Sequence, residues 1–168
     1  CTRCIDACPT DAIEPWKVDA RRCISYLTLE HRSAIPAELH ESLGDWLAGC
    51  DICQEVCPHN QPTAARASTS HAEAFEPSRQ GFDLLEVLGW AEEDRRAAFQ
   101  GSALKRVKYD AFKRNALILL TNQVCQGDLE AKSTLLDQLH AIEQNESASE
   151  VLRLSLIHIS EPTRRKRI

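Results

Sequence analysis

The chain has 168 residues, of which 43% are apolar, so it can form one domain or two small ones with a mainly aliphatic core. Its formal net charge of −5 excludes a uniformly basic nucleic-acid-binding protein, so any basic surface must be a local patch. The longest wholly aliphatic run, Ala116 to Leu120, is far shorter than the ~20 residues of a membrane-spanning helix.

Residues 1–60 contain a repeated cysteine motif. The sequence CTRCIDACP at residues 1–9 recurs as CDICQEVCP at residues 50–58, and both read C-x2-C-x3-C-P. The bacterial ferredoxin run is C-x2-C-x2-C-x3-C-P, and its last cysteine binds the other cluster of a pair. The two blocks therefore predict a small bacterial ferredoxin-like module with two 4Fe–4S clusters, although each block lacks the first cysteine of the run.

This scheme distributes seven cysteines between the two clusters. One cluster is predicted to be bound by Cys8, Cys23, Cys50 and Cys53, with Cys23 replacing the missing first cysteine of the second block. The other cluster is predicted to be bound by Cys1, Cys4 and Cys57. The chain has no methionine and begins inside a motif, so we expect a fragment or a processed product whose fourth ligand precedes residue 1. We therefore expect one robust cluster and one labile cluster.

Other interpretations of the cysteines remain open. Two C-x2-C pairs can form a Cys4 zinc site, and eight cysteines can form the disulfides of a secreted protein, although no signal peptide is visible. A three-cysteine cluster with one open iron is a further alternative. Cys125 lies apart from both blocks, and we expect it to be a small buried hydrophobic residue.

Short elements are expected between the two cysteine blocks. Residues 12–14 and 17–18 can form two very short strands around Pro15. Residues 24–31 and 37–43 can form short helices, the second of them preceded by Pro36. Residues 61–80 are polar and contain proline, serine and threonine, so we expect a linker there.

From residue 81 onward the apolar spacing predicts helices. The first two are expected at residues 84–89 and 91–99, and a third is expected to be capped by Asp110. The buried face of this third helix should consist of Ala111, Phe112, Asn115, Ala116, Leu119 and Leu120. A fourth helix is marked by Leu129, Leu135, Leu136, Leu139 and Ile142, and a fifth is expected to be capped by Ser149. Residues 81–154 therefore predict an all-α, HEAT-like repeat region, and the whole chain an α+β fold.

One dense basic stretch follows the second of these helices. It consists of Lys105, Arg106, Lys108, Lys113 and Arg114. By composition alone it is either a solvated helix face or a set of phosphate contacts. Asn115 shares a face with apolar residues, and we expect it to cap or bridge the backbone inside the repeat.

Three sequence strings together resemble one enzyme family. They are CPTDAI at residues 8–13, DARRCISYLTLEH at residues 19–31 and GCDICQEVCPHN at residues 49–60. Residues 1–154 resemble epoxyqueuosine reductase, a family that binds cobalamin and two 4Fe–4S clusters. The resemblance implies reduction of epoxyqueuosine to queuosine at the wobble position of tRNA, with electrons passing through the clusters to cobalamin.

The resemblance also implies roles for individual residues. It assigns the two clusters to the same cysteine sets, and it places Ser25, Arg32, Cys50 and Asp51 against cobalamin. It places Lys105, Arg106 and Lys108 against tRNA. The strings LKRVKY at residues 104–109 and RNAL at residues 114–117 look like the HEAT-like tRNA-binding region of the family. His59 stands where the family pattern leads us to expect tryptophan.

The implied partners are a tRNA with a GUN anticodon and an external electron donor, and the implied protein is a cytoplasmic monomer. The family's catalytic acid is expected in an N-terminal cobalamin domain that this chain lacks, so we expect the chain alone to be inactive. From Ser155 the resemblance ends, and residues 155–168 read as a translated sequencing adapter, that is, as a non-native or disordered tail; the alternative is a natural, variable terminus. The alternative function is a ferredoxin-type electron carrier with a helical docking domain and no role with RNA.

Overall fold

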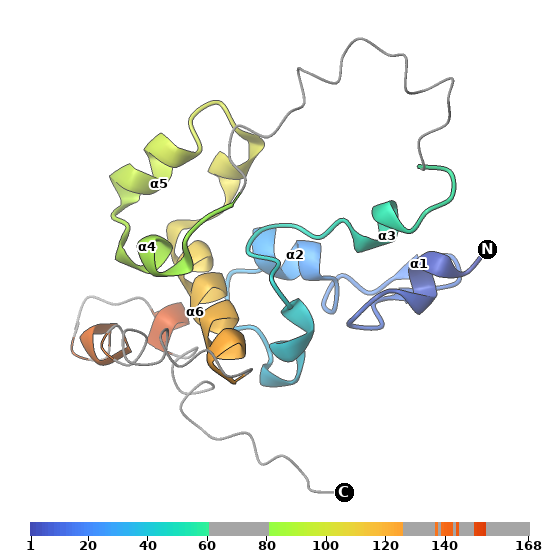
Figure 1. Ribbon diagram of the computed structural model, residues 1–168, viewed down its shortest axis with the longest axis horizontal. Coiled ribbons are helices and arrows are strands. Elements are labelled where there is room, and N and C mark those ends of the chain that lie inside the picture. The colour runs from blue at the N-terminus through green and yellow to red at the C-terminus, as the bar shows by residue number, and fades with distance from the viewer. Residues whose placement is uncertain (61–80, 126–136, 138, 143, 145–149, 154–168) are drawn as a thin grey trace, which may run out of the picture.

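The computed structural model describes residues 1–60, 81–125, 137, 139–142, 144 and 150–153. Within them the fold is rich in helices and contains one two-stranded sheet. The cysteine-rich elements lie at one end of the molecule and helices α4 and α5 at the other, with α2 and α6 between them (Figure 1). The expected linker at 61–80 and tail at 155–168 lie outside the described residues.

The two cysteine blocks fold in the same way. The first forms helix α1 (Arg3–Asp6) and the second helix α3 (Ile52–Glu55), and these one-turn helices pack together. In both blocks the residue after the first cysteine, Thr2 or Asp51, accepts two backbone N–H groups through its carbonyl oxygen. The sequence repeat is therefore also a structural repeat.

A small hairpin follows the first block. Strands β1 (Ile13–Glu14) and β2 (Lys17–Val18) pair in antiparallel fashion, with Glu14 opposite Lys17. This confirms the two strands predicted around Pro15. Trp16 occupies the turn with a positive φ of 65°, a conformation that bulky residues rarely adopt, and its side chain is fully exposed.

The segment between the hairpin and the second block is less helical than the sequence predicts. Helix α2 spans Ile24–Leu29 and ends two residues earlier than expected. The predicted helix at 37–43 consists of two 3-10 turns, η1 (Ala37–Leu39) and η2 (Glu41–Leu43). Short helical segments often adopt this tighter geometry because they form few hydrogen bonds of either kind.

The helical half contains α4 (Leu84–Gly89), α5 (Glu92–Ala98), η4 (Ala103–Arg106) and α6 (Tyr109–Cys125). The first two helices agree with the prediction, whereas the 3-10 helix η4 was not predicted. Helix α6 begins one residue before Asp110, so this aspartate lies in the first turn and is not the cap. The later predicted helices lie partly outside the described residues, of which 137, 139–142, 144 and 150–153 are helical.

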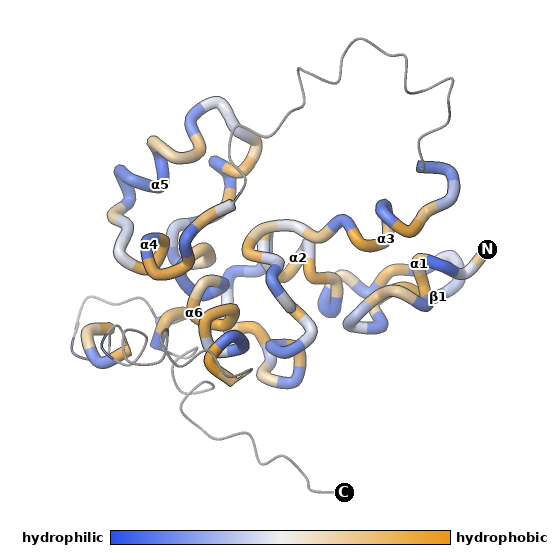
Figure 2. Tube along the Cα trace, viewed as in Figure 1, coloured by the Kyte–Doolittle hydropathy of each residue, from blue (hydrophilic) through white to orange (hydrophobic). Residues whose placement is uncertain are grey.

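Helix α6 is buried on more than the one predicted face. All six residues of that face are buried, and so are Arg114, Leu117 and Ile118. The reason is that α6 contacts both α4 and α2, so two sides of the helix are covered. Figure 2 shows hydrophobic residues along α6 and on α4, whereas α5 is largely hydrophilic.

Two hydrophobic cores meet on α6. The larger core joins α4, α5 and α6 and includes Phe99 and Phe112, whose rings stack at 4.7 Å. The smaller core joins the cysteine-rich part to Ile118 and Leu119 of α6; its other members are Ile24, Leu27, Ile35, Leu39 and Leu43. The cysteine-rich segment therefore packs against the helical half, and α6 contributes residues to the core between them. No helix in the described part of the chain is both long and apolar enough to cross a membrane.

Candidate metal centre

Four cysteines from three separate segments come together beside α3. Burial is the main reason why the pKa of the Cys50 thiol is raised, and negative charge on Cys53, Cys23 and Cys8 raises it further. Like charges act in this way only over short distances. The four thiols are the set predicted from the sequence to bind one cluster. They fit such a cluster because thiolates that repel one another are stabilised when they bind iron.

The turn after the first block lowers the pKa of the Cys8 thiol. Burial opposes ionisation of Cys8, but hydrogen bonds from Thr10, Ala12 and Ile13 outweigh it and lower the pKa of the thiol. The Ala12 N–H donates to the Cys8 Sγ at 3.3 Å, and the Thr10 hydroxyl lies 3.6 Å from the same sulfur. Hydrogen bonds to cluster sulfurs are one of the ways in which a protein sets a cluster potential.

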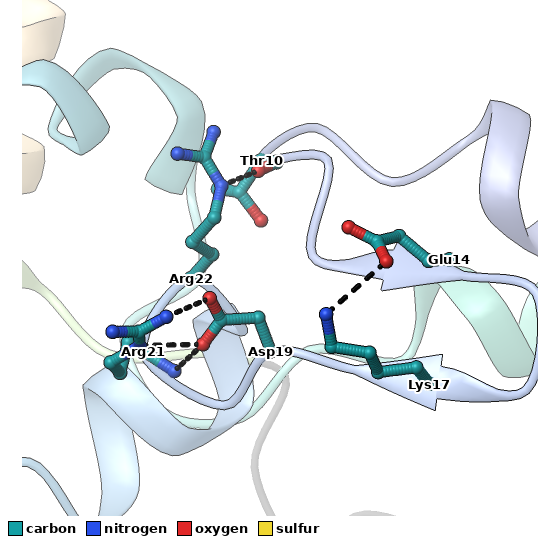
Figure 3. A network of polar contacts seen from close by, with 6 residues as sticks. All are labelled: Thr10, Glu14, Lys17, Asp19, Arg21 and Arg22. Atoms are coloured by element: carbon teal, nitrogen blue, oxygen red, sulfur yellow. Dashed lines mark hydrogen bonds and ion pairs between the residues drawn. The ribbon is translucent and has the colours of Figure 1, made fainter.

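One arginine side chain ties this turn to the segment that leads to Cys23. The Arg22 Nε donates to the Thr10 carbonyl oxygen at 2.7 Å (Figure 3). In the same view Arg21 donates hydrogen bonds to both carboxylate oxygens of Asp19. These hydrogen bonds lower the pKa of Asp19 to about 2. Lys17 pairs with Glu14 across the hairpin. The contact of Arg22 with Thr10 thus joins the turn that carries Cys8 to the segment before Cys23, whereas the pairs of Arg21 and Lys17 are local.

The other predicted set is more open. Cys1 is exposed, whereas Cys4 and Cys57 are partly buried, and they lie on the paired blocks of α1 and α3. All eight cysteine thiols are free. Among the described residues, no three His, Cys, Asp or Glu side chains are close enough to share one metal ion. The cysteines of a 4Fe–4S cluster bind different irons and need not meet at one ion.

The residues expected to face cobalamin lie on the segments that follow Cys23 and Cys50 in the chain. Ser25 lies in the first turn of α2, two residues after Cys23, and is partly buried. Asp51 is exposed and lies between Cys50 and α3, while Arg32 is exposed beyond the end of α2. No contact between these side chains joins them into a common surface within the described part of the chain.

The residues expected to contact tRNA lie on and after η4. Lys105, Arg106 and Lys108 are all exposed. Arg106 forms an ion pair with Glu30 at 3.1 Å, which partly neutralises it. The described residues contain no ion pair of Lys105 or Lys108. The buried Arg95 on α5 donates to the carbonyl oxygens of Lys105 and Val107 at 3.0 Å and so holds this segment in place.

Arg114 and Asn115 have roles that differ from those predicted from the sequence. Arg114 is fully buried, so it cannot be part of an exposed basic surface. Asn115 does bridge backbone groups, but they belong to Thr28 and Leu47 in the cysteine-rich part and not to the repeat. The only signal of this role in the sequence was the position of Asn115 on an apolar face.

Cys125 is exposed at the end of α6, so the prediction of a buried hydrophobic residue was wrong.

Residues 1–60 match the family of 4Fe-4S double cluster binding domains. Over 120 residues the chain is 47% identical to an epoxyqueuosine reductase from Cyclobacterium marinum, covering 68% of this chain and 36% of that protein. Over 160 residues it is 36% identical to an epoxyqueuosine reductase from Shewanella oneidensis, covering 95% of this chain and 38% of that protein. The chain thus spans less than half the length of these curated relatives.

Solved structures give the same result for the fold. The structure resembles that of epoxyqueuosine reductase from Bacillus subtilis with a TM-score of 0.59 and 25% identity, covering 95% of this chain and 49% of that one. It also resembles a crystal structure of epoxyqueuosine reductase with a tRNA-Tyr epoxyqueuosine-modified tRNA stem loop, with a TM-score of 0.57 and 24% identity over 95% of this chain and 48% of that one. These matches confirm the resemblance found in the sequence and identify the chain as a relative of the epoxyqueuosine reductases that corresponds to part of their length.

Proposed function

We propose that this chain is the electron-relay and tRNA-contacting part of an epoxyqueuosine reductase, the enzyme that reduces epoxyqueuosine to queuosine in tRNA. The observation that carries the proposal is the match of residues 1–60 to a double-cluster iron–sulfur domain, within which Cys8, Cys23 and Cys53 act electrostatically on Cys50. One 4Fe–4S cluster is bound by these four thiols. A second is bound by Cys1, Cys4 and Cys57, with one further ligand from outside this set.

The cluster at Cys50 is the one that faces the proposed cobalamin. When bound, cobalamin supplies the cobalt chemistry that the reduction of an epoxide needs, and Ser25, Arg32, Cys50 and Asp51 are the residues of this chain that contact it. The protein's own contribution is to set the cluster potential through burial and hydrogen bonds, as at Cys8. The electron donor is a separate protein or small reductant, and the place of action is the cytoplasm.

The tRNA contact lies on the helical half, which we propose to be the start of a HEAT-like repeat region at residues 81–154. Lys105, Arg106 and Lys108 project from a segment whose backbone is fixed by Arg95. A similar fold has been crystallised with a modified tRNA stem loop, which supports RNA as the partner of this surface. Exposed basic side chains on a fixed segment suit phosphate contacts, because their position is then set before binding.

The cluster assignment is tested by anaerobic reconstitution of the chain with iron and sulfide. The protein should acquire brown charge-transfer absorption, and Cys50→Ser should lower its iron and sulfide content because a thiolate ligand is lost. Cys125→Ser is the matched control, since Cys125 is exposed at the far end of α6, and it should bind as much iron as the parent. A colourless protein that binds zinc stoichiometrically would contradict the proposal.

The RNA assignment is tested by gel-shift binding to an anticodon stem loop from a tRNA with a GUN anticodon. Replacing both Lys105 and Lys108 with alanine should weaken binding and reduce the slope of log affinity against log salt by about 1–2. Glu30→Gln should tighten binding, because it releases Arg106 from its ion pair.

The control for charge alone replaces Lys17 and Arg21, two exposed cations of the cysteine-rich part, with alanine. This variant has the same net charge as the lysine variant and should bind the stem loop as the parent does. Absence of binding by the parent chain, or equal weakening by both double variants, would favour the alternative of a ferredoxin-type electron carrier with a helical docking domain.

A further inference from the structure

Helix α6 presents two adjacent polar residues to the cysteine-rich part, and both are fully buried. Arg114 and Asn115 are each 0% exposed. The amide group of Asn115 donates two hydrogen bonds, one to the carbonyl oxygen of Thr28 at 2.9 Å and one to that of Leu47 at 2.8 Å. A single side chain thus joins two segments that are separated by nearly twenty residues of chain.

Arg114 binds the end of α2 in the same manner. Its guanidinium donates to the carbonyl oxygens of Leu27, His31 and Ser33, each at 2.7 Å. It also donates to the Asn115 Oδ1 from Nη2 at 2.8 Å and from Nε at 3.1 Å, which fixes the orientation of the amide. The cation lies at the carboxyl end of α2, where free carbonyl groups and the helix dipole favour positive charge.

The two segments held in this way each lead directly to a cysteine of the same proposed cluster. Helix α2 begins immediately after Cys23, which is its N-cap residue. The segment after Leu47 reaches Cys50 in three residues, and the Gly49 N–H donates to the Thr28 Oγ1 at 2.9 Å. Thr28 is therefore hydrogen-bonded to both Asn115 and Gly49, and it lies between the two ligand-bearing segments.

Burying this polar pair carries a desolvation cost. Arg114 has no carboxylate partner among its contacts, and burial lowers its pKa to about 10. Buried charges cost desolvation energy and are often no more stabilising than apolar residues of similar size. What the polar pair provides is a fixed hydrogen-bond geometry, since its donors reach the carbonyl oxygens of five residues and the Asn115 Oδ1.

We propose that Arg114 and Asn115 are positioning residues through which the helical half fixes the separation of Cys23 and Cys50, two ligands of the Cys8–Cys23–Cys50–Cys53 cluster. The inference rests on the proposed cluster binding and extends it, because it makes the stability of that cluster depend on α6. Outer contacts of this kind orient the ligands of metal sites, and losing them typically weakens the site 10–100-fold.

The test uses the full chain reconstituted with iron and sulfide in a Cys4→Ser background, so that the Cys8–Cys23–Cys50–Cys53 set is the intact one. Asn115→Asp keeps the shape of the side chain and an acceptor for Arg114, but removes both N–H donors. Thr28→Val keeps the shape of Thr28 but removes the oxygen that accepts the Gly49 N–H. Cluster absorbance during incubation with an iron chelator gives the rate of loss, and EPR of the reduced cluster reports its ligand geometry.

Arg95→Lys is the matched control. Arg95 is also a buried arginine that donates to two backbone carbonyls, but these belong to η4 and its end, not to α2 or the segment before Cys50. Its replacement should lower the thermal unfolding midpoint while leaving the EPR spectrum and the rate of cluster loss unchanged. The two test variants should lose the cluster about tenfold faster and change its EPR spectrum.

The inference is overturned if Asn115→Asp retains the parent rate and EPR spectrum, or if Arg95→Lys accelerates the loss equally for the same fall in unfolding midpoint. Should Asn115→Asp fail to fold, Thr28→Val decides between the same two outcomes, because it removes only one hydroxyl group, which accepts from the Gly49 N–H and donates to the Ile24 carbonyl oxygen of the same helix. A parent chain that takes up no cluster would instead contradict the proposed function itself, so the two failures are distinguishable.

Discussion

Two arginines are buried among the described residues, and their charges are stabilised in different ways. Arg95 pairs with Glu92 at 2.7 Å, and this hydrogen-bonded contact raises the pKa of the arginine. Arg114 meets carbonyl oxygens and an amide, and burial lowers its pKa to about 10. Arg95 therefore depends on a titratable partner, whereas Arg114 depends on backbone geometry.

The contact between Glu92 and Arg95 makes stability depend on pH in the acid range. Hydrogen bonds from Arg95 and then Arg96 lower the pKa of Glu92 from 4.5 to about 2. The folded state thus binds this proton less tightly than the unfolded state, so the contribution is complete above pH 4.5 and is lost as the pH falls toward 2. Glu92→Gln should lower the thermal unfolding midpoint at pH 6, and this difference from the parent should disappear near pH 2. If the difference in unfolding midpoint stayed constant with pH, the ionised carboxylate of Glu92 would not be the source of the stabilisation.

At the scale of single elements, the helices differ in whether a side chain accepts the backbone N–H groups at their N-termini. Helix α4 is capped by Asp83, whose side chain accepts the N–H groups of Leu85 and Glu86 at 2.8 and 3.2 Å. Helices α1 and α3 have no side-chain cap and consist of one turn each. A single turn is not stable alone, because nucleating a helix is unfavourable. These two helices therefore depend on their mutual packing, and we expect cluster binding to strengthen it.

The cap of α4 provides a prediction at this scale. Asp83→Ala should lower the free energy of unfolding by about 1 kcal/mol, because two backbone donors lose their acceptor. Asp83→Asn preserves an acceptor oxygen and should cost much less. Urea denaturation of the three proteins gives the comparison, and hydrogen exchange at Leu85 and Glu86 should accelerate in the alanine variant. Equal stability of all three proteins would show that the cap contributes nothing measurable.

At the scale of the whole molecule, α6 is the element that unites the chain. Its residues Leu117 and Leu120 belong to the core with α4 and α5, while Ile118 and Leu119 belong to the core with α2. The Arg114–Asn115 pair adds polar contacts to the same boundary. The cysteine-rich and helical parts should therefore unfold together.

This cooperativity can be measured with a cavity in the smaller core. Ile118→Ala should cost about 2–5 kcal/mol, because a fully buried side chain is truncated. Loss of cluster absorbance and loss of helical circular dichroism should shift to lower denaturant by the same amount. Leu117→Ala, its neighbour in the larger core, should shift both signals as well. Two separate transitions, of which only one moved, would contradict a shared core.

Local features of the fold could be predicted well from the sequence. The two strands around Pro15 and the helices α4 and α5 follow from short-range spacing, turn residues and capping. The start of α6, the 3-10 helix η4 and the early end of α2 could not be predicted, because tertiary contacts decide them. The burial of Arg114 could not be predicted either, since a charged residue is normally exposed and nothing nearby in the sequence marks it as buried.

The sequence by itself determined the chemistry of this protein. The spacing of the cysteines sets which thiols can meet at one cluster, and the strings around them are specific enough to identify the relatives. Only the tertiary structure decided that α6, some ninety residues after Cys23, is hydrogen-bonded to the segments that carry Cys23 and Cys50, two ligands of the proposed cluster. The physical reason is that ligand spacing is a local property of the chain, whereas hydrogen bonds between distant segments exist only once the core has brought those segments together.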